Sequence, residues 1–254
     1  MCNVYATSDW HGCGDVAKKV FDFLQPDDIL YFLGDANDRG PDGYALIKQL
    51  LNDKRVIYIK GNHEDFFEKY TKELKDETNF SGEFYWLGRN GGEKTYEAAI
   101  KDFELDKIIK KVKDLPLKKI YYSHEGHTVI MDHSGYTPGN IRYHHDPLWD
   151  RDHFDESWSK DEMFENVYIV HGHTPVQYLK FMFGYNGQPK ERSQDEIEAK
   201  NDFLADRPTT WKPTILRYCN EHKFCIDMCT IASGRIALLN LDTFEEIYFD
   251  KDEE

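Results

Sequence analysis

The first third of the chain repeats one pattern, in which a short apolar run is followed by a polar tip and then by a stretch with helical spacing. Short uninterrupted apolar runs predict buried strands, and apolar residues recurring every three or four positions predict helices. We therefore predict strands at 4–8, 29–33 and 56–59, each followed by a helix, at 15–24, 42–51 and 64–74. Such alternation is typical of an α/β fold, which binds ligands at the carboxyl ends of its strands, where the polar tips fall here.

The rest of the chain changes from alternating elements to successive strands. Residues 83–114 predict helices with a break at Asn90-Gly91-Gly92 and an end at Pro116. Apolar runs then predict strands at 120–123, 128–131, 167–170, 224–228, 235–241 and 246–249. This change indicates a second, mixed sheet packed on the first.

We therefore expect an α/β fold in which two mixed β-sheets pack as a sandwich flanked by helices. With 254 residues, one large domain spanning 1–254 fits better than two small ones. Residues 184–213 are polar, charged and proline-containing, and we expect them to form an inserted loop or lid.

The charge of the chain limits its partners. Forty-seven acidic residues against 32 Lys and Arg give a formal net charge of −15. A surface this negative repels nucleic acid and anionic lipid, so we expect neither nucleic acid nor a membrane as a partner. It also repels an anionic substrate, unless the binding site concentrates positive charge locally.

Cysteine usage and the N-terminal residues predict a cytoplasmic protein. The five cysteines are an odd number and include no C-x-x-C pair, which suits neither a disulfide framework nor a zinc ribbon. The N-terminus has no basic region followed by an apolar run, and no apolar stretch approaches the length of a membrane span.

Four clusters of carboxylate, imidazole and amide side chains each follow an apolar run. They are Asp9-x-His11-Gly12, then Gly34-Asp35-x-x-Asp38-Arg39-Gly40, then Gly61-Asn62-His63-Glu64, and finally Asp132-His133-Ser134-Gly135 with His171-Gly172-His173-Thr174. Such ligands suit divalent ions such as Mn²⁺, Fe²⁺ or Zn²⁺. Each cluster alone has a simpler interpretation, as a charged turn, a helix start or a core histidine. Their co-occurrence at predicted strand ends favours a metal site.

The first three clusters resemble the three signatures of the calcineurin-like metallophosphoesterases. The Asp38-Arg39-Gly40 segment resembles the phosphoprotein phosphatase branch, which includes bacterial and bacteriophage serine/threonine phosphatases and is related to the symmetrical diadenosine tetraphosphatases. This resemblance runs from Asp9 to about His173, and the segments Ile226-Asp227 and Gly234-Arg235 are similar to the closing strands of the family.

The resemblance implies a site with two divalent metal ions, with Mn²⁺ as the first candidate and Fe or Zn as alternatives. Asp9 and His11 would hold the first ion, and Asp35 would bridge both. The second ion would be completed by Asn62, His133 and His173. In such centres the two ions activate a water that attacks phosphorus.

The same resemblance implies the residues that would act on the substrate. His63 would protonate the departing oxygen as the general acid, and Asp38 would orient His63. Arg39 and Arg151 would bind the phosphate oxygens, which would answer the electrostatic objection raised by the acidic surface.

Several positions depart from the family pattern or leave alternatives open. Ser8 precedes Asp9 where the family usually has glycine, and Asp132 precedes His133 where it favours a small or apolar residue. His124 is therefore an alternative to His133. His171 and His173 alternate along a predicted strand and should face opposite ways, with His171 in a structural role. A solvated ion pair is the alternative role for Arg151, which lies among several aspartates.

Three functions follow from these expectations. The first is a phosphatase acting on phosphoserine, phosphothreonine or phosphotyrosine in proteins, or on a small phosphate monoester. The second is hydrolysis of diadenosine tetraphosphate or a related nucleotide, which acidic stretches at 152–156 and 161–165 disfavour. The third is an inactive phosphatase fold that only binds a partner, which would have lost ligands that this chain retains. Aromatic residues between 178 and 211 are candidates for a substrate wall, although packing in a lid or core is the alternative.

Overall fold

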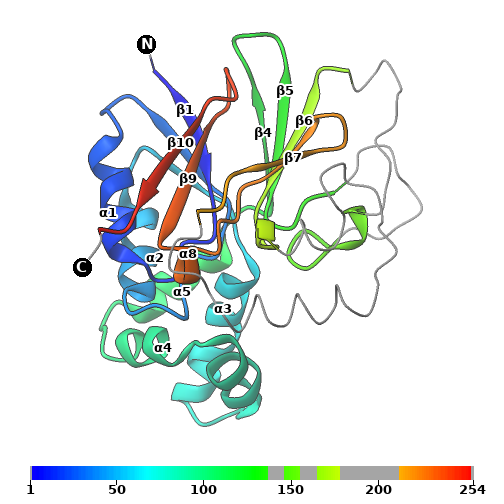
Figure 1. The fold of residues 1–254 in the computed structure, drawn as a ribbon. Coiled ribbons are helices and arrows are strands. Elements are labelled where there is room, and N and C mark those ends of the chain that lie inside the picture. Colours follow the sequence, from blue (N-terminus) through cyan, green and yellow to red (C-terminus); the bar gives the residue numbers. More distant parts are fainter. Residues whose placement is uncertain (1, 137–145, 155–164, 178–211, 253–254) are drawn as a thin grey trace.

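The computed structural model describes residues 2–136, 146–154, 165–177 and 212–252 (Figure 1). These residues form two mixed five-stranded sheets flanked by helices, which confirms the predicted fold class. The expected insertion at 184–213, apart from its last two residues, and the aromatic residues between 178 and 211 lie outside the described residues.

The first sheet has the strand order β10-β9-β1-β2-β3. Its members are β1 (Val4–Thr7), β2 (Ile29–Phe32), β3 (Val56–Tyr58), β9 (Arg235–Asn240) and β10 (Glu246–Asp250). Strands β1, β2 and β3 are parallel, with Ala6 opposite Tyr31 and Tyr31 opposite Ile57. Because parallel strands end at one edge of a sheet, the three loops that carry the predicted ligands lie together.

The second sheet has the order β4-β5-β6-β8-β7. Its members are β4 (Lys118–Tyr122), β5 (Thr128–Asp132), β6 (Val167–His171), β7 (Leu216–Tyr218) and β8 (Lys223–Cys225). Strands β5, β6 and β8 are parallel to one another. The loops after β5 and β6 hold His133 and His173, so this sheet contributes the remaining predicted ligands.

Helices cover the outer face of the first sheet. They are α1 (Gly14–Phe23), α2 (Gly43–Asn52), α3 (Asn62–Lys75), the π-helix η1 (Glu83–Gly88), α4 (Glu93–Ala99) and α5 (Leu105–Lys113). One apolar core lies between these helices and the sheet, and a second lies between the two sheets. Two short helices complete the described elements, η2 (Asp152–Phe154) and α8 (Thr230–Ser233).

The last two strands differ from the expectation, because β9 and β10 join the first sheet rather than the second. All six residues of β9 are buried. Ile236 and Leu238 face the core under the helices, whereas Ala237 and Leu239 face the core between the sheets. A strand that is apolar on both faces suits an inner position in a sheet that is covered on both sides. Accordingly, β9 pairs with β1 on one edge and with β10 on the other.

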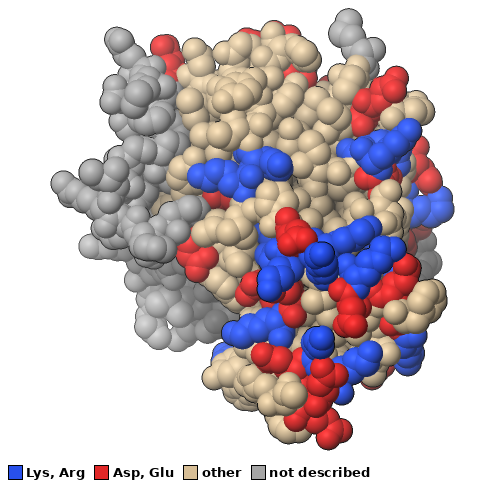
Figure 2. Space-filling model, turned by 180° about the vertical axis from the view of Figure 1, so that it is seen from behind, with Lys and Arg blue, Asp and Glu red and all other residues tan. Residues whose placement is uncertain are grey.

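Surface helices follow their apolar spacing. In α5, Leu105, Ile108 and Val112 are buried, and lysines occupy its last turn, where a positive charge interacts favourably with the helix dipole. Figure 2 shows that lysines and arginines on one face of the molecule are interleaved with acidic side chains. Within the described ranges, no helix combines the length and the apolar character that crossing a bilayer requires.

Candidate active site

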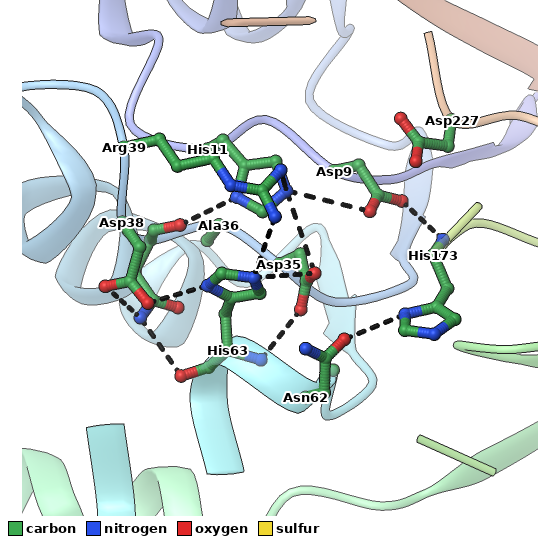
Figure 3. A network of polar contacts seen from close by, with 12 residues as sticks. Asp9, His11, Asp35, Ala36, Asp38, Arg39, Asn62, His63, His173 and Asp227 are labelled. Carbon is green, nitrogen blue, oxygen red and sulfur yellow. Dashed lines mark hydrogen bonds and ion pairs between the residues drawn. The ribbon is translucent and has the colours of Figure 1, made fainter. Parts of the chain in front are cut away.

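The loops after β1 and β2 are joined through their backbones. The amides of Asp9 and His11 donate to the carbonyls of Gly34 and Asp35, at 3.0 Å each, and the Gly12 amide donates to Ala36 at 2.8 Å. This ladder continues the β1–β2 pairing past the strand ends. It places the side chains of Asp9, His11 and Asp35 in one pocket, as Figure 3 shows.

The side chain of Glu64 joins the loop after β2 to the loop after β3. Its carboxylate accepts hydrogen bonds from the amides of Asp35, Ala36 and Gly61, each at 2.8 Å, and from the Tyr58 hydroxyl at 2.7 Å. The side chain is fully buried. The sequence pattern allowed Glu64 only a favourable place near a helix start, whereas the structure shows it holding two ligand loops together.

Six site residues other than glycine have left-handed backbone conformations. Their φ angles lie between 41° and 70°, and they are Asp9, His11, Asp35, Asp38, Arg39 and His173. Positive φ is uncommon for residues with a side chain and costs roughly 1–3 kcal/mol at each strained position. This concentration of unfavourable backbone is typical of a functional site, where side-chain placement outweighs local conformational preference.

Candidate metal ligands form two groups that share one carboxylate. In the first, the ligand atoms of His11, Asp35 and His63 lie within 4.8 Å of one another; in the second, those of Asp35, His133 and His173 do so. Asn62 belongs beside the second group, because its Oδ1 lies 2.9 Å from both His133 Nε2 and His173 Nδ1. Asp35 therefore lies between two sites, as a bridging ligand must.

Asp9 lies beside both groups. Its Oδ1 is 3.9 Å from His11 Nε2, and its Oδ2 accepts a hydrogen bond from the His173 amide at 3.0 Å. Asp9 Oδ1 is buried and has no hydrogen-bond partner among the described residues. A side chain at Gly172 would place its Cβ 2.0 Å from Asp9 Oδ2, so only glycine leaves this carboxylate room.

The electrostatics of the pocket fit a divalent cation. Burial, together with Asp227, raises the pKa of Asp9 well above its usual value. Burial would also raise the pKa of Asp35, but His133 and His63 hold it well below that value. Burial would lower the pKa of His133, yet Asp35 raises it to about 10. A buried carboxylate with one oxygen that lacks a hydrogen-bond partner, beside imidazole and amide ligands, is a suitable environment for an ion.

His63 and Asp38 form a buried hydrogen-bonded pair. His63 Nδ1 donates to Asp38 Oδ2 at 2.7 Å, which leaves Nε2 facing the pocket. Burial would lower the pKa of His63, but the carboxylates of Asp35 and Asp38 raise it. Arg39 lies over this side of the pocket, with its guanidinium nitrogens 3.2 Å from His63 Nε2 and 2.8 Å from His11 Nε2.

Arg151 contacts the loop that carries His173. Its Nε donates to Thr174 Oγ1 at 3.1 Å. Partial burial lowers its pKa, while the carboxylates of Asp227, Asp35 and Asp9 act in the opposite direction. Arg151 is exposed, so a solvated role stays its alternative, although the charges of these carboxylates act on its guanidinium.

Neither His124, the alternative to His133, nor His171, predicted to be structural, belongs to the ligand groups. His124 is exposed in the turn between β4 and β5, where its amide donates to Asp242. His171 is buried at the end of β6, and its ring contacts the Tyr218 hydroxyl at 2.6 Å. His173 follows the end of the strand in a left-handed conformation, so its direction comes from that turn rather than from strand alternation.

One site residue had no predicted role. Asp227 follows β8, is buried, and has a pKa that burial raises to about 6. Figure 3 shows it beside Asp9. The only signal in the sequence was its place after an apolar run in a segment similar to the closing strands of the family.

Comparisons with known proteins agree with this geometry. A sequence model of calcineurin-like phosphoesterases matches residues 2–206. No curated protein sequence matches the chain. Among solved structures, a candidate diadenosine tetraphosphatase has a TM-score of 0.57 at 14% identity, covering 99% of this chain and 95% of its own.

Two further solved structures are similar at low identity. A cold-active protein tyrosine phosphatase has a TM-score of 0.53 at 17% identity, covering 94% of this chain and 74% of its own. A serine/threonine phosphatase from Saccharomyces cerevisiae, similar to human PP5, has a TM-score of 0.50 at 14% identity, covering 100% of this chain and 81% of its own. At these identities the likeness shows a shared fold. Because the family match spans most of the sequence and includes every strand end that carries a predicted ligand, the chain belongs to the calcineurin-like phosphoesterase family.

Proposed function

We propose that this protein is a phosphatase that uses two divalent metal ions to hydrolyse phosphate monoesters. The observation that carries the proposal is the position of Asp35, whose carboxylate belongs to both groups of candidate ligands. Of the first group, His11 and Asp35 would hold one ion together with Asp9, whose Oδ1 lies 3.9 Å from His11 Nε2, and His63 would act on the substrate instead. Asp35, Asn62, His133 and His173 would hold the other ion. Bound there, the ions would supply Lewis-acid chemistry that lowers the pKa of water and offsets phosphoryl charge.

His63 is the proposed general acid. Its Nε2 faces the pocket, and its Nδ1 is held by Asp38. Proton transfer from Nε2 to the departing oxygen would leave an alcohol, and the Asp38 carboxylate would keep the ring directed at that oxygen throughout. Arg39 and Arg151 would bind the phosphate oxygens from two sides, which supplies local positive charge in a protein of net charge −15.

Phosphoserine and phosphothreonine in proteins are the substrate class that we propose first. Their alkoxide leaving groups are strongly basic, so they benefit most from a positioned acid such as His63. A nucleotide polyphosphate has a less basic leaving group and carries more negative charge, which an acidic surface disfavours. The phenoxide leaving group of phosphotyrosine is intermediate in basicity, so we expect an intermediate dependence on His63.

The free cysteines of the described chain suit a reducing compartment, which supports a cytoplasmic location. The strongly acidic composition supports the absence of nucleic-acid and membrane partners.

Phosphate release from an aryl phosphate, measured with and without Mn²⁺, tests the proposed activity. We expect turnover that requires the ion and is abolished by a chelator. His63→Asn should retain metal but lose on the order of 10²–10⁴ in rate. If the protein with Mn²⁺, Fe²⁺ or Zn²⁺ is inert on every phosphate ester, the fold serves binding rather than catalysis.

A substrate panel under the same conditions tests the proposed class. Phosphoserine, phosphothreonine and phosphotyrosine peptides should be compared with mononucleotides and diadenosine tetraphosphate at equal concentrations. A higher kcat/KM for the phosphopeptides is the expected result. A preference for diadenosine tetraphosphate would replace the protein phosphatase assignment and leave the chemistry of the site intact.

A further inference from the structure

Asp38 receives a hydrogen bond that the proposed chemistry has not yet used. The indole Nε1 of Trp86 donates to Asp38 Oδ2 at 2.8 Å. The same oxygen accepts the bond from His63 Nδ1 at 2.7 Å. Trp86 and Asp38 are 48 positions apart in the sequence, and both are fully buried. Trp86, Asp38 and His63 therefore form a continuous chain of hydrogen bonds that ends in the active site.

The donors around Asp38 fix the orientation of its carboxylate. Its second oxygen accepts from Asn37 Nδ2 at 2.9 Å, and its own amide donates to Thr95 Oγ1 at 3.0 Å. Because the Asp38 side chain is completely buried, no water replaces these donors, and rotation of the carboxylate would break its hydrogen bonds to the protein. Asn37 is the chain neighbour of Asp38, so, apart from His63 itself, Trp86 is the side-chain donor from another element that sets the direction of Oδ2.

The element that carries Trp86 has an unusual local structure. It is the π-helix η1, a form that is rare and often occurs at functional sites. Within it, Phe84 and Tyr85 are 60% and 50% exposed, whereas Trp86 is completely buried. The wider turn thus directs one aromatic residue of three inwards, toward Asp38.

Packing holds the indole in this position. The rings of Phe67 and Tyr96 contact it edge to face, with centroids 6.2 and 6.1 Å away. A Cβ at Gly92 would lie 2.4 Å from Nε1 and 2.5 Å from Cε2. Since the indole is rigid and enclosed, any side chain at position 92 would push its N–H away from Asp38.

We propose that Trp86 is a positioning residue of the reaction, which acts through Asp38 to hold the His63 imidazole in line with the departing oxygen. The proposal rests on the assignment of His63 as the general acid. In that step a water oxygen forms a bond to phosphorus, the P–O bond to the leaving group breaks, and the leaving oxygen takes the proton from His63 Nε2. A carboxylate with one fixed oxygen keeps Nε2 aimed at this position, whereas a carboxylate free to rotate does not.

Two substrates that differ in leaving group separate this role from a purely structural one. An alkyl phosphate has a basic leaving group and needs the acid, whereas a nitrophenyl phosphate needs it little. We expect Trp86→Phe, which removes the N–H and keeps most of the ring, to lower kcat for the alkyl substrate by on the order of 10-fold. Turnover of nitrophenyl phosphate should fall much less, with KM unchanged for both.

Gly92→Ala provides a second variant that displaces the indole without deleting it. Its φ is negative, so alanine is acceptable to the backbone and its effect comes from contact with Trp86. It should reproduce the leaving-group dependence of Trp86→Phe. Trp10→Phe is the matched control, because Trp10 is also fully buried and donates Nε1 to Thr7 Oγ1 at 2.9 Å. It should leave the ratio of the two rates unchanged.

A double variant tests whether Trp86 acts through His63. In a His63→Asn background, Trp86→Phe should have no further effect on either rate, because the ring that it positions is absent. Additive losses in the double variant, or equal losses for both leaving groups in Trp86→Phe, would overturn the proposal. An unchanged alkyl rate in Trp86→Phe, with His63→Asn still defective, would reject Trp86 alone and leave the proposed function standing.

A spectroscopic measurement tests the hydrogen bond without turnover. The indole N–H signal of Trp86, identified by its loss in Trp86→Phe, should move upfield in Asp38→Asn, because a neutral acceptor binds this donor more weakly than a carboxylate. An unmoved signal would show that Asp38 is not its acceptor in solution and would exclude the proposed role.

Discussion

At the scale of single residues, Asp35 has the most constrained position in the site. Its carboxylate is shared by two ligand groups, and its backbone has a φ of 61°. The His63 amide donates to one of its oxygens at 3.0 Å, so the side chain is also fixed from the helix α3. We therefore expect that replacing Asp35 disrupts both groups of candidate metal ligands.

Asp35→Asn should therefore release both ions together. The amide has one oxygen instead of two and carries no negative charge, so it cannot neutralise or join two cations. Metal analysis after dialysis should show little of either ion. Asp227→Asn is the matched control, because Asp227 is buried beside the site but belongs to neither ligand group, and it should keep both ions. Full occupancy of both sites in Asp35→Asn would contradict the bridging role.

The proximity of the predicted ligands could be expected from the sequence because they lie in short contiguous motifs at strand ends, such as Asp9-x-His11. The roles of Glu64 and Trp86 could not be identified in this way. Glu64 binds amides 28 and 29 positions away, and Trp86 binds an acceptor 48 positions away. Such contacts depend on how helices pack, which the hydrophobic pattern of one segment does not determine.

At the scale of elements, Glu64 shows how the first turn of α3 supports two loops. Glu64→Gln should lower the free energy of unfolding by about 2–3 kcal/mol, because one of the three backbone donors would face an amide NH₂. Denaturant unfolding without metal measures this effect. Glu68→Gln, on the same helix, alters a single ion pair with Lys60 at 2.9 Å and should cost less, because the amide keeps one acceptor oxygen and Lys60 Nζ keeps its bond to the Lys113 carbonyl. If both variants lost the same free energy of unfolding, Glu64 would contribute only through its negative charge on α3 and not through its bonds to the loop amides.

The pairing of β9 with β10 is supported by a bidentate contact between Arg235 and Asp250, with nitrogen–oxygen distances of 2.6 and 2.9 Å. This contact lowers the pKa of Asp250 to about 2. Since the pKa in the folded state lies below its unfolded value of about 3.9, the stabilisation is present above that pH and is lost as pH falls toward 2.

Asp250→Asn should therefore destabilise the protein near neutral pH, and the difference from the unsubstituted protein should narrow as the pH falls from about 4 toward 2. The Asp250 side chain is 38% exposed, so solvent screening keeps the effect below about 1 kcal/mol. Denaturant unfolding over this pH range measures it. A difference that grows in acid would mean that another group dominates.

Most strands and helices were predictable because their apolar spacing is regular. Residues 83–88 fall in the predicted helical range, but the π form of η1 was not predicted, and neither was the strand β7. Strand β7 has three residues, too few for an alternating pattern to be distinctive, and apolar spacing does not distinguish a single π turn from an α-helix. The sheet that β9 and β10 join depends on pairing with β1, which the order of elements alone does not determine.

At the scale of the whole molecule, metal binding should stabilise the fold, because the ligands come from both sheets and meet only in the native state. One ion at a free concentration a hundredfold above its Kd adds about 2.7 kcal/mol to the free energy of unfolding. For a chain of this length that corresponds to a rise in Tm of roughly 5–10 °C. Calorimetry with Mn²⁺ and with a chelator measures the shift. Asp35→Asn should show none, and an equal rise in that variant would indicate binding elsewhere.

The strand order of the first sheet also has a consequence for synthesis. The strand β1 lies between β2 and β9, with Tyr5 opposite Asn240. During synthesis, all the predicted ligands, up to His173, emerge before β9. Until β9 emerges, one edge of β1 has no paired strand. Because an open apolar edge favours pairing with other chains, chaperone dependence should be greatest just before β9 leaves the ribosome.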